Sequence, residues 1–224
     1  MAYRFERPQS PFLRALPLII CGIGAIALLI TRPANDRVLL EGGIDKEMGG
    51  CLDNLGQISK AYAMYARDFD GKIPFGVDPE DHFHPEIWQD EGIGNYSGAF
   101  YKTAKEAPYL HEVLRPYVKS PEVFHCPADN GWTQSRLPTL ARSSLRNVTP
   151  SSYGKFGTSY YVFTKFGFAQ NRADDIASPS QSLLLFDGDL WHVNSNQELL
   201  NGLFADGHAQ NLTATEFEFY ARNG

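Results

Sequence analysis

A run of 17 uncharged and mostly apolar residues, 15–31, lies between Arg14 and Arg32 near the start of the chain. As an α-helix this run is about 25 Å long, which approaches the hydrocarbon thickness of a bilayer. Pro33 follows immediately and ends such a helix. The run therefore predicts a transmembrane helix at residues 15–32 and leaves the rest of the chain to fold outside the lipid.

We expect this helix to stay in the mature protein as an anchor. A signal peptidase needs small residues before its cut site, and Ala25 and Ala27 meet that need formally. The apolar residues 28–30 continue the hydrophobic core beyond that site, which a cleaved signal peptide does not do. The sequence therefore favours a retained helix over a secretory signal.

The placement of arginines predicts how the helix is oriented. Arg4, Arg7 and Arg14 precede the helix, Arg32 is its last residue, and Arg37 follows it. Lysine and arginine are enriched on the cytoplasmic side of membrane helices. We therefore expect residues 1–14 in the cytoplasm, the helix in the inner (cytoplasmic) membrane, and the domain in the periplasm or outside the cell.

Small residues gather on one part of the predicted helix. Gly22, Gly24 and Ala25 form a face at which another membrane helix can approach closely. This face predicts contact with other membrane-protein subunits.

The charge of the chain excludes one class of partner. The net charge is −6, and because residues 1–33 carry +3, the remainder carries −9. Nucleic-acid binding needs a basic surface, so no nucleic-acid partner is expected. Six carboxylates without a lysine or arginine lie within residues 76–91, and we interpret this run as a solvated acidic loop.

The body of the chain predicts an α+β fold. Residues 33–46 are a polar connector, and residues 47–224 form the domain. Apolar residues recur every three or four positions from Met48 to Phe69, which predicts a long helix that stops at Asp70-Gly71. Strands are expected at 158–164, 182–186, and 202–205 with 208–212 as a hairpin, and shorter helices at 104–118 and 213–220.

Two cysteines lie in the body. An oxidising compartment can join Cys51 and Cys126 as a disulfide, and the equal alternative is two separate buried thiols.

The six histidines invite a test for catalysis or metal binding. His82 and His84 lie among Glu80, Asp81 and Glu86, residue types that bind divalent metals, although a wet polar loop is the simpler interpretation. His208 follows Asp206-Gly207, which is typical of a turn. Because no nucleophile or phosphate-binding motif occurs, we expect no enzyme activity, no cofactor and no small-molecule substrate.

Several segments taken together carry a family resemblance. They are 51–74, 114–129 with Pro116-Tyr117-Val118-Lys119 and Cys126-Pro127-Ala128-Asp129, and 176–187 and 203–209 with Asp206-Gly207. Across residues 48–213 the chain resembles bacterial pilin-like (prepilin-type) proteins, whose C-terminal region has a His-x9-Asp-Gly signature. The resemblance implies a pilin- or pseudopilin-like fold, in which a long helix packs on an antiparallel sheet.

The chain departs from this family in two places. The family begins with a Gly cut site and a Glu inside the apolar helix, and here Pro11 and Leu16 stand at those positions. Cleavage by a prepilin peptidase is therefore not expected, and without the carboxylate the chain is a poor filament subunit. In addition, 13 residues rather than nine separate His192 from Asp206.

These observations predict a non-catalytic, membrane-anchored structural protein. We expect an accessory subunit of a larger membrane assembly, such as a secretion, respiratory or photosynthetic complex. One alternative is a metal-binding module or metal-dependent enzyme that uses His82 and His84. The other is a pseudopilin-type filament component.

Overall fold

The structure, a computed structural model, describes residues 46–88, 102–137 and 145–223. All of them belong to one of the two units into which the chain divides, Leu39–Gly224. The predicted membrane helix, 15–32, and its face of Gly22, Gly24 and Ala25 lie outside the described residues. None of the described helices is both long and apolar enough to cross a membrane.

The longest described helix, α1 (Lys46–Asp68), is built on one apolar stripe. Its buried positions recur every one, three or four residues and are Cys51, Leu55, Ile58, Ala61 and Tyr62. Beyond its end, Asp70 and Gly71 have φ angles of 54° and 80°, in the left-handed region that commonly ends a helix. The predicted long helix and its stop are confirmed.

One antiparallel sheet forms the centre of the domain. Its strands are β3 (Tyr160–Val162), β4 (Leu183–Asp187), β5 (His192–Asn194), β6 (Gln197–Phe204) and β7 (Ala209–Thr213). Leu203 of β6 pairs with Leu185 of β4 on one edge and with Ala209 of β7 on the other. Strand β5 pairs with the first residues of β6, and β3 pairs with β4. Strand β6 therefore pairs with three strands of this sheet, β4, β5 and β7.

The predicted hairpin at the end of the chain is confirmed. Strands β6 and β7 pair antiparallel around Asp206-Gly207, and Gly207 has a φ of 90°, which glycine adopts readily. Strand β6 begins at Gln197, five residues before the predicted start.

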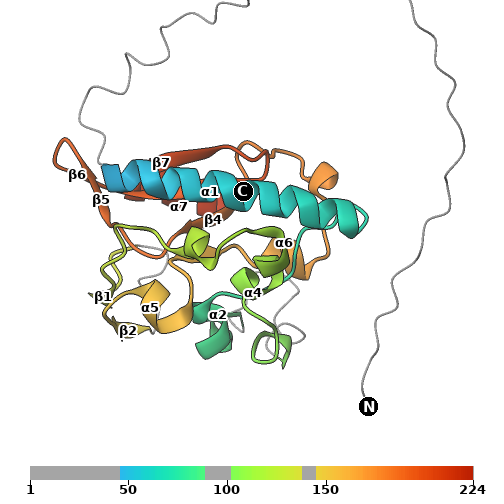
Figure 1. Cartoon of the computed structure of the whole chain (residues 1–224), viewed down its shortest axis with the longest axis horizontal. Coiled ribbons are helices and arrows are strands. Elements are labelled where there is room, and N and C mark those ends of the chain that lie inside the picture. The colour runs from blue at the N-terminus through green and yellow to red at the C-terminus, as the bar shows by residue number, and fades with distance from the viewer. Residues whose placement is uncertain (1–45, 89–101, 138–144, 224) are drawn as a thin grey trace, which may run out of the picture. The chain divides into compact units, whose positions relative to one another are not determined.

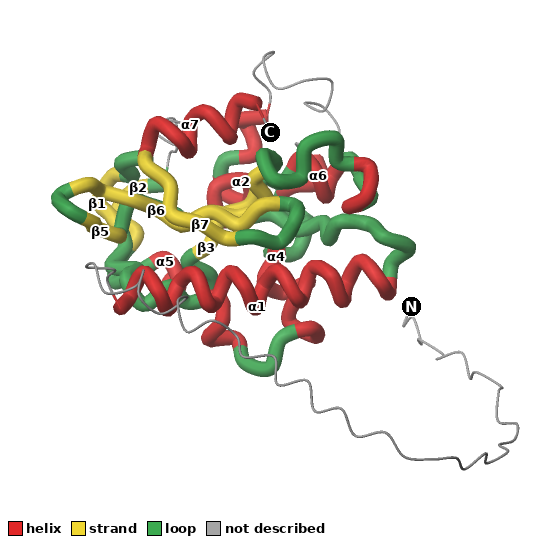
Figure 2. Tube along the Cα trace, turned by 90° about the horizontal axis from the view of Figure 1, so that it is seen from above, coloured by secondary structure: helices red, strands yellow, loops and turns green. Residues whose placement is uncertain are grey.

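Helices cover both faces of this sheet. Figure 2 shows α1 along one face and α7 (Ala214–Asn223) along the other. In Figure 1 the same α1 crosses in front of the strands. From α7 the fully buried Phe217 packs its ring 4.8 Å from that of Phe186 in β4. The α+β class is therefore confirmed.

Short elements fill the middle of the chain. They are α2 (Pro79–Phe83), η2 (Pro85–Trp88), α4 (Leu110–Leu114), η4 (Arg115–Tyr117), η5 (Pro121–Phe124), α5 (Ser152–Phe156), α6 (Lys165–Phe168) and η7 (Ala173–Asp175). Strands β1 (Trp132–Gln134) and β2 (Arg146–Val148) form a separate antiparallel pair.

The helix predicted at 104–118 is wrong in its first half. Helix α4 starts only at Leu110, because the preceding residues form a bridge with Val77. The amide of Val77 donates to the carbonyl of Pro108, and the amide of Leu110 donates to the carbonyl of Val77, both at 3.0 Å. Pro108 also disfavours a helical backbone at the residue before it.

A disulfide between Cys51 and Cys126 joins α1 to the segment after η5, and both residues are fully buried. Two hydrogen bonds hold the peptide group between His125 and Cys126. Asn54 Nδ2 donates to the carbonyl of His125 at 2.8 Å, and the amide of Cys126 donates to Ser159 Oγ at 3.0 Å. Of the two alternatives that the sequence leaves open, the structure has the bonded pair.

Replacing both cysteines with alanine, Cys51→Ala with Cys126→Ala, should lower the free energy of unfolding. The bond joins residues 75 positions apart, and constraining the unfolded chain in this way contributes about 3 kcal/mol. The expected fall in Tm is roughly 6–12 °C, measured by circular dichroism of the full chain in mild detergent. As a control, dithiothreitol should lower the Tm of the wild type but not that of the double variant. Equal Tm values for the two proteins would contradict this role.

Candidate functional site

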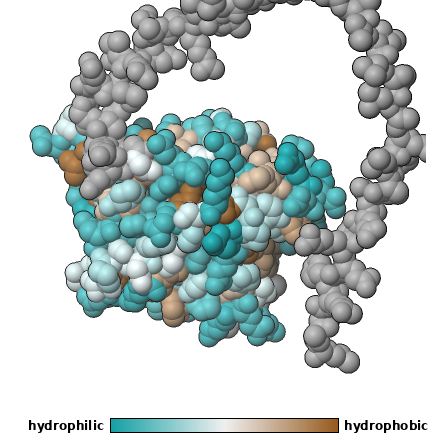
Figure 3. All heavy atoms as spheres, viewed as in Figure 1, coloured by the Kyte–Doolittle hydropathy of each residue, from teal (hydrophilic) through white to brown (hydrophobic). Residues whose placement is uncertain are grey.

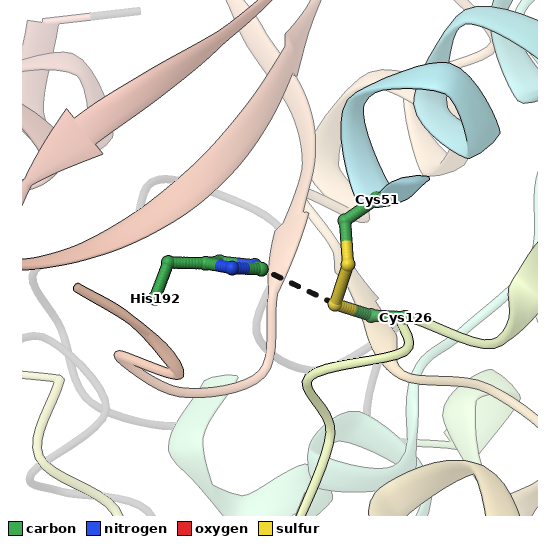
Figure 4. A group of neighbouring side chains, drawn as sticks. All are labelled: Cys51, Cys126 and His192. Carbon is green, nitrogen blue, oxygen red and sulfur yellow. Dashed lines mark hydrogen bonds between the residues drawn. A yellow bond between two sulfur atoms is a disulfide. The ribbon is translucent and has the colours of Figure 1, made fainter. Parts of the chain in front are cut away.

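One group of three potential metal or redox ligands lies together within the described stretches: Cys51, Cys126 and His192. Their ligand atoms all lie within 4.8 Å of one another. Figure 4 shows the disulfide extending from α1 to Cys126, with the ring of His192 facing it. His192 Nε2 lies 3.5 Å from Cys126 Sγ. All three residues are fully buried, so the group belongs to the interior of the domain.

The sheet positions the histidine and two further polar residues. Asp187 ends β4, His192 begins β5, and Asn201 lies in β6 between those strands. The pairing of Phe186 with Gly202 places Asp187 beside Asn201. All three polar residues are fully buried and lie within hydrogen-bond distance of one another, with His192 next to the disulfide. A turn of four residues between β4 and β5 is thus enough to bring Asp187 and His192 together.

Hydrogen bonds link these polar side chains. The amide of Asn201 donates to Asp187 Oδ2 at 2.7 Å, and Asn211 Nδ2 donates to Asn201 Oδ1 at 2.7 Å. His192 Nε2 lies 3.1 Å from Asp187 Oδ2 and 2.9 Å from Asn201 Nδ2. A ring protonated on Nε2 donates to the carboxylate, whereas one protonated on Nδ1 accepts from the amide.

The cluster is not saturated with hydrogen bonds. Within the part of the chain that the structure describes, Asp187 Oδ1 and His192 Nδ1 are buried without a hydrogen-bond partner. Burial raises the pKa of Asp187, although its hydrogen bond with His192 lowers that pKa in part. Buried polar atoms normally have partners, so two without one in a single cluster call for an explanation.

The burial limits what the cluster can do. An external substrate does not reach side chains that are fully buried in this conformation. The groups themselves support two kinds of chemistry, thiol–disulfide exchange at the cysteines and metal binding by thiolate, imidazole and carboxylate. In the disulfide form the cluster joins α1 to β4, β5 and β6.

His82 and His84 are not part of a comparable cluster. The structure places His84 Nδ1 2.9 Å from Glu86 Oε1. The ring of His82 instead packs 5.1 Å from the ring of Tyr109. Among the described residues, these histidines do not form a group of three or more ligand atoms with the nearby carboxylates.

The prediction of a solvated acidic loop at 76–91 is wrong for its first part. Asp78, Glu80 and Asp81 are buried. Asp78 caps α2 by accepting from the amide of Asp81 at 2.9 Å, and it also accepts from the amide of Val162 at 3.1 Å. Burial, followed by repulsion from Asp81, raises the pKa of Asp78 well above its usual value. The carboxylate thus connects α2 to β3.

Asp129 is a structural residue for which the sequence indicated no role of its own. It is buried and accepts hydrogen bonds from the amides of Gly131, Ser152 and Tyr153 at 2.8–3.0 Å, and from Ser159 Oγ at 2.7 Å. Because these donors are spread over 29 positions, only folding brings them together. The one available signal was its place in the segment Cys126-Pro127-Ala128-Asp129.

Asp206 and His208 form a surface pair at the β6–β7 turn. Asp206 Oδ1 accepts from the amide of His208 at 3.1 Å and lies 2.5 Å from its Nδ1. The His208 ring stacks on that of Phe204 at 4.4 Å. Beside the pair is a mostly apolar cavity of about 160 Å³, whose lining includes Ser59 and Tyr62. Ligand pockets are larger, about 300–1,000 Å³.

Comparison of the sequence with models of protein families and with curated proteins, and of the chain with solved structures, gave no match.

The surroundings of His111 change the acidity of its ring. Its ring stacks on Tyr109 at 5.4 Å and lies 5.8 Å from the ring of Phe124. Burial lowers its pKa, opposed by the charge of Glu112, and its Nδ1 has no hydrogen-bond partner in the described part of the chain.

His111 should therefore make the domain sensitive to acid. Its folded pKa lies below the unfolded value of about 6.5, so the unfolded state binds more protons. Its contribution to stability is present above about pH 6.5 and is lost as the pH falls through the folded pKa. Urea unfolding at several pH values should show a weaker loss in His111→Phe than in the wild type. His125→Phe, which changes a partly exposed ring stacked on Tyr153, is the control and should keep the wild-type loss. Identical pH profiles for wild type and His111→Phe would contradict the assignment.

Proposed function

We propose that this chain is a membrane-anchored, non-catalytic accessory subunit of a larger membrane assembly. Residues 15–32 anchor it in the inner membrane with residues 1–14 in the cytoplasm. The domain lies on the outer side and acts through protein–protein contacts. Pro11 and Leu16 favour this role over that of a cleaved filament subunit.

The observation that carries the proposal is the buried disulfide between Cys51 and Cys126. Disulfides persist in oxidising compartments and are rare in the cytoplasm. The disulfide therefore supports a domain outside the cytoplasm, which is the side that the arginines near residues 15–32 also favour.

The arrangement of the domain supports the pilin-like interpretation. Helix α1 begins 14 residues after the predicted membrane helix and packs on β6 and β7. A long helix that follows a membrane anchor and lies on an antiparallel sheet is the architecture that the family resemblance implies.

The surface favours contacts through small apolar areas. The face seen in Figure 3 is mainly hydrophilic, with apolar residues in separate patches. Large apolar side chains that are about half exposed are Phe69, Phe83, Val193 and Phe219. Aromatic residues are enriched at the centres of protein interfaces, so these positions suit contacts with neighbouring subunits.

The compartment can be tested by the state of the cysteines in the native cells. Cells are quenched with acid, and the denatured protein is treated with a maleimide–polyethylene glycol reagent before or after reduction. Wild type should gain one adduct before reduction, at Cys21 within the predicted membrane helix, and three after it. Cys21→Ala is the control and should gain none before reduction and two after it. Adducts on Cys51 and Cys126 without reduction would place the domain in a reducing compartment.

The assembly can be tested by purification in mild detergent. The protein should co-purify with one reproducible set of membrane subunits at fixed stoichiometry, identified by mass spectrometry. Gly22→Leu with Gly24→Leu should release those subunits, because bulky side chains block close helix approach. Leu28→Ile is the control and should retain them. A lone monomer from wild-type membranes would refute the accessory role.

A further inference from the structure

We propose that, when Cys51 and Cys126 are in the dithiol form, the buried cluster binds one Zn²⁺ ion through both sulfur atoms, His192 Nε2 and a carboxylate oxygen of Asp187. This inference goes beyond the proposed function and does not depend on it. It concerns the reduced, dithiol state of Cys51 and Cys126.

The ligand types match zinc. Structural zinc sites are closed and tetrahedral and take four ligands from cysteine, histidine and carboxylate side chains. Here α1, the segment after η5, β5 and β4 each supply one such side chain. All four residues are fully buried, as a closed structural site requires.

Two of the distances already fit a tetrahedral site. Zinc–sulfur bonds of about 2.3 Å and zinc–nitrogen bonds of about 2.05 Å separate the two ligand atoms by about 3.6 Å in a tetrahedron. Cys126 Sγ and His192 Nε2 are 3.5 Å apart. The same geometry separates nitrogen and carboxylate oxygen by about 3.4 Å, and His192 Nε2 lies 3.1 Å from Asp187 Oδ2.

Two movements complete the site. The Asp187 carboxylate, which is outside the group of three residues whose ligand atoms lie within 4.8 Å of one another, approaches the sulfur atoms, and the sulfur atoms separate. Reduction breaks the covalent bond between them, and a tetrahedral site then holds them about 3.8 Å apart. Cys51 lies in the second turn of α1, so a change in its side-chain torsion moves its sulfur while the helix stays in place. Asn201 Nδ2, now 2.9 Å from His192 Nε2, gives up that contact to the metal.

One buried atom without a partner supplies an independent reason for a cation. Asp187 Oδ1 lacks a hydrogen-bond partner within the described residues, so the disulfide form leaves this carboxylate incompletely satisfied in the interior. A cation at this point would interact with Asp187. On His192 the metal would occupy the lone pair of Nε2 and keep the proton on Nδ1, which gains no partner from the metal.

The chemical balance is simple. Two electrons and two protons convert the disulfide into two thiols, and a dithiol or phosphine supplies the electrons. Zn²⁺ then displaces the two thiol protons as it binds. Because the same sulfur atoms serve both states, zinc and the disulfide exclude each other. The disulfide joins α1 to the segment after η5, and zinc would join these two segments to β4 and β5 as well.

The test uses the full chain in mild detergent with Cys21→Ala, which leaves Cys51 and Cys126 as its cysteines. The protein is reduced with a phosphine under anaerobic conditions, freed of reductant and titrated with Co²⁺. We expect one ion per chain, with thiolate-to-cobalt charge-transfer absorption that an equal amount of Zn²⁺ abolishes. Zn²⁺ should also protect both cysteines from alkylation, as measured by mass spectrometry. Reduced protein that gives no charge-transfer band overturns the proposal.

A variant tests whether His192 is a ligand. His192→Gln should weaken Zn²⁺ binding at least about 10-fold, since changes at or near a metal ligand have effects of this size or larger. His208→Gln is the matched control on the surface and should bind as the wild type does. Equal affinity in all three proteins overturns the assignment of His192.

If His192→Gln fails to fold, X-ray absorption of the zinc-loaded protein that retains His192 still tests the proposed ligands. Two sulfur atoms at about 2.3 Å and two lighter atoms at about 2.0–2.2 Å support the site. A shell of lighter atoms alone refutes it.

Discussion

One disulfide, beside a buried polar cluster, fixes the position of α1 against the rest of the domain. The disulfide from Cys51 to Cys126 spans 75 positions of sequence and holds the long helix against the segment that leads into the β1–β2 pair. Around it, Asn54 donates to the carbonyl of His125 and Ser159 Oγ accepts from the amide of Cys126, and Tyr160 OH donates to the carbonyl of Cys51 at 3.4 Å. The hydrophobic face of α1 supplies burial, and the disulfide fixes where along the helix this segment docks.

The polar cluster beside the disulfide contains residue types that are typical of a functional site, but it is as buried as the hydrophobic core. His192, Asp187 and Asn201 meet there because β4, β5 and β6 are neighbours, and two of their polar atoms have no partner in the described residues. A joint with cysteines, imidazole and carboxylate has two chemical states available, a disulfide or a bound metal. In either state it connects α1 to the segment after η5.

Local patterns along the chain predicted the elements but not the contacts between distant ones. The three- and four-residue spacing in α1, the turn at Asp70-Gly71 and the Asp206-Gly207 hairpin all follow from backbone preferences of a few neighbouring residues. The first half of the helix predicted at 104–118 is wrong because Val77, about 30 positions away, holds the backbone at Tyr109 extended. The acidic run at 76–91 looks solvated by composition, yet Asp78 is buried because Val162 and Asp81 donate hydrogen bonds to it.

The sequence by itself determined the apolar run at 15–31, the acidic charge of the body and its α+β composition, since these follow from local hydrophobicity and propensity. It also supplied Cys51 and Cys126 as a pair but left open whether they bond. Only the tertiary structure decided that the two sulfur atoms meet, and that they do so beside His192 and Asp187. The physical reason is that this site draws its atoms from four elements up to 141 positions apart, and their convergence depends on how the helix docks and the strands pair.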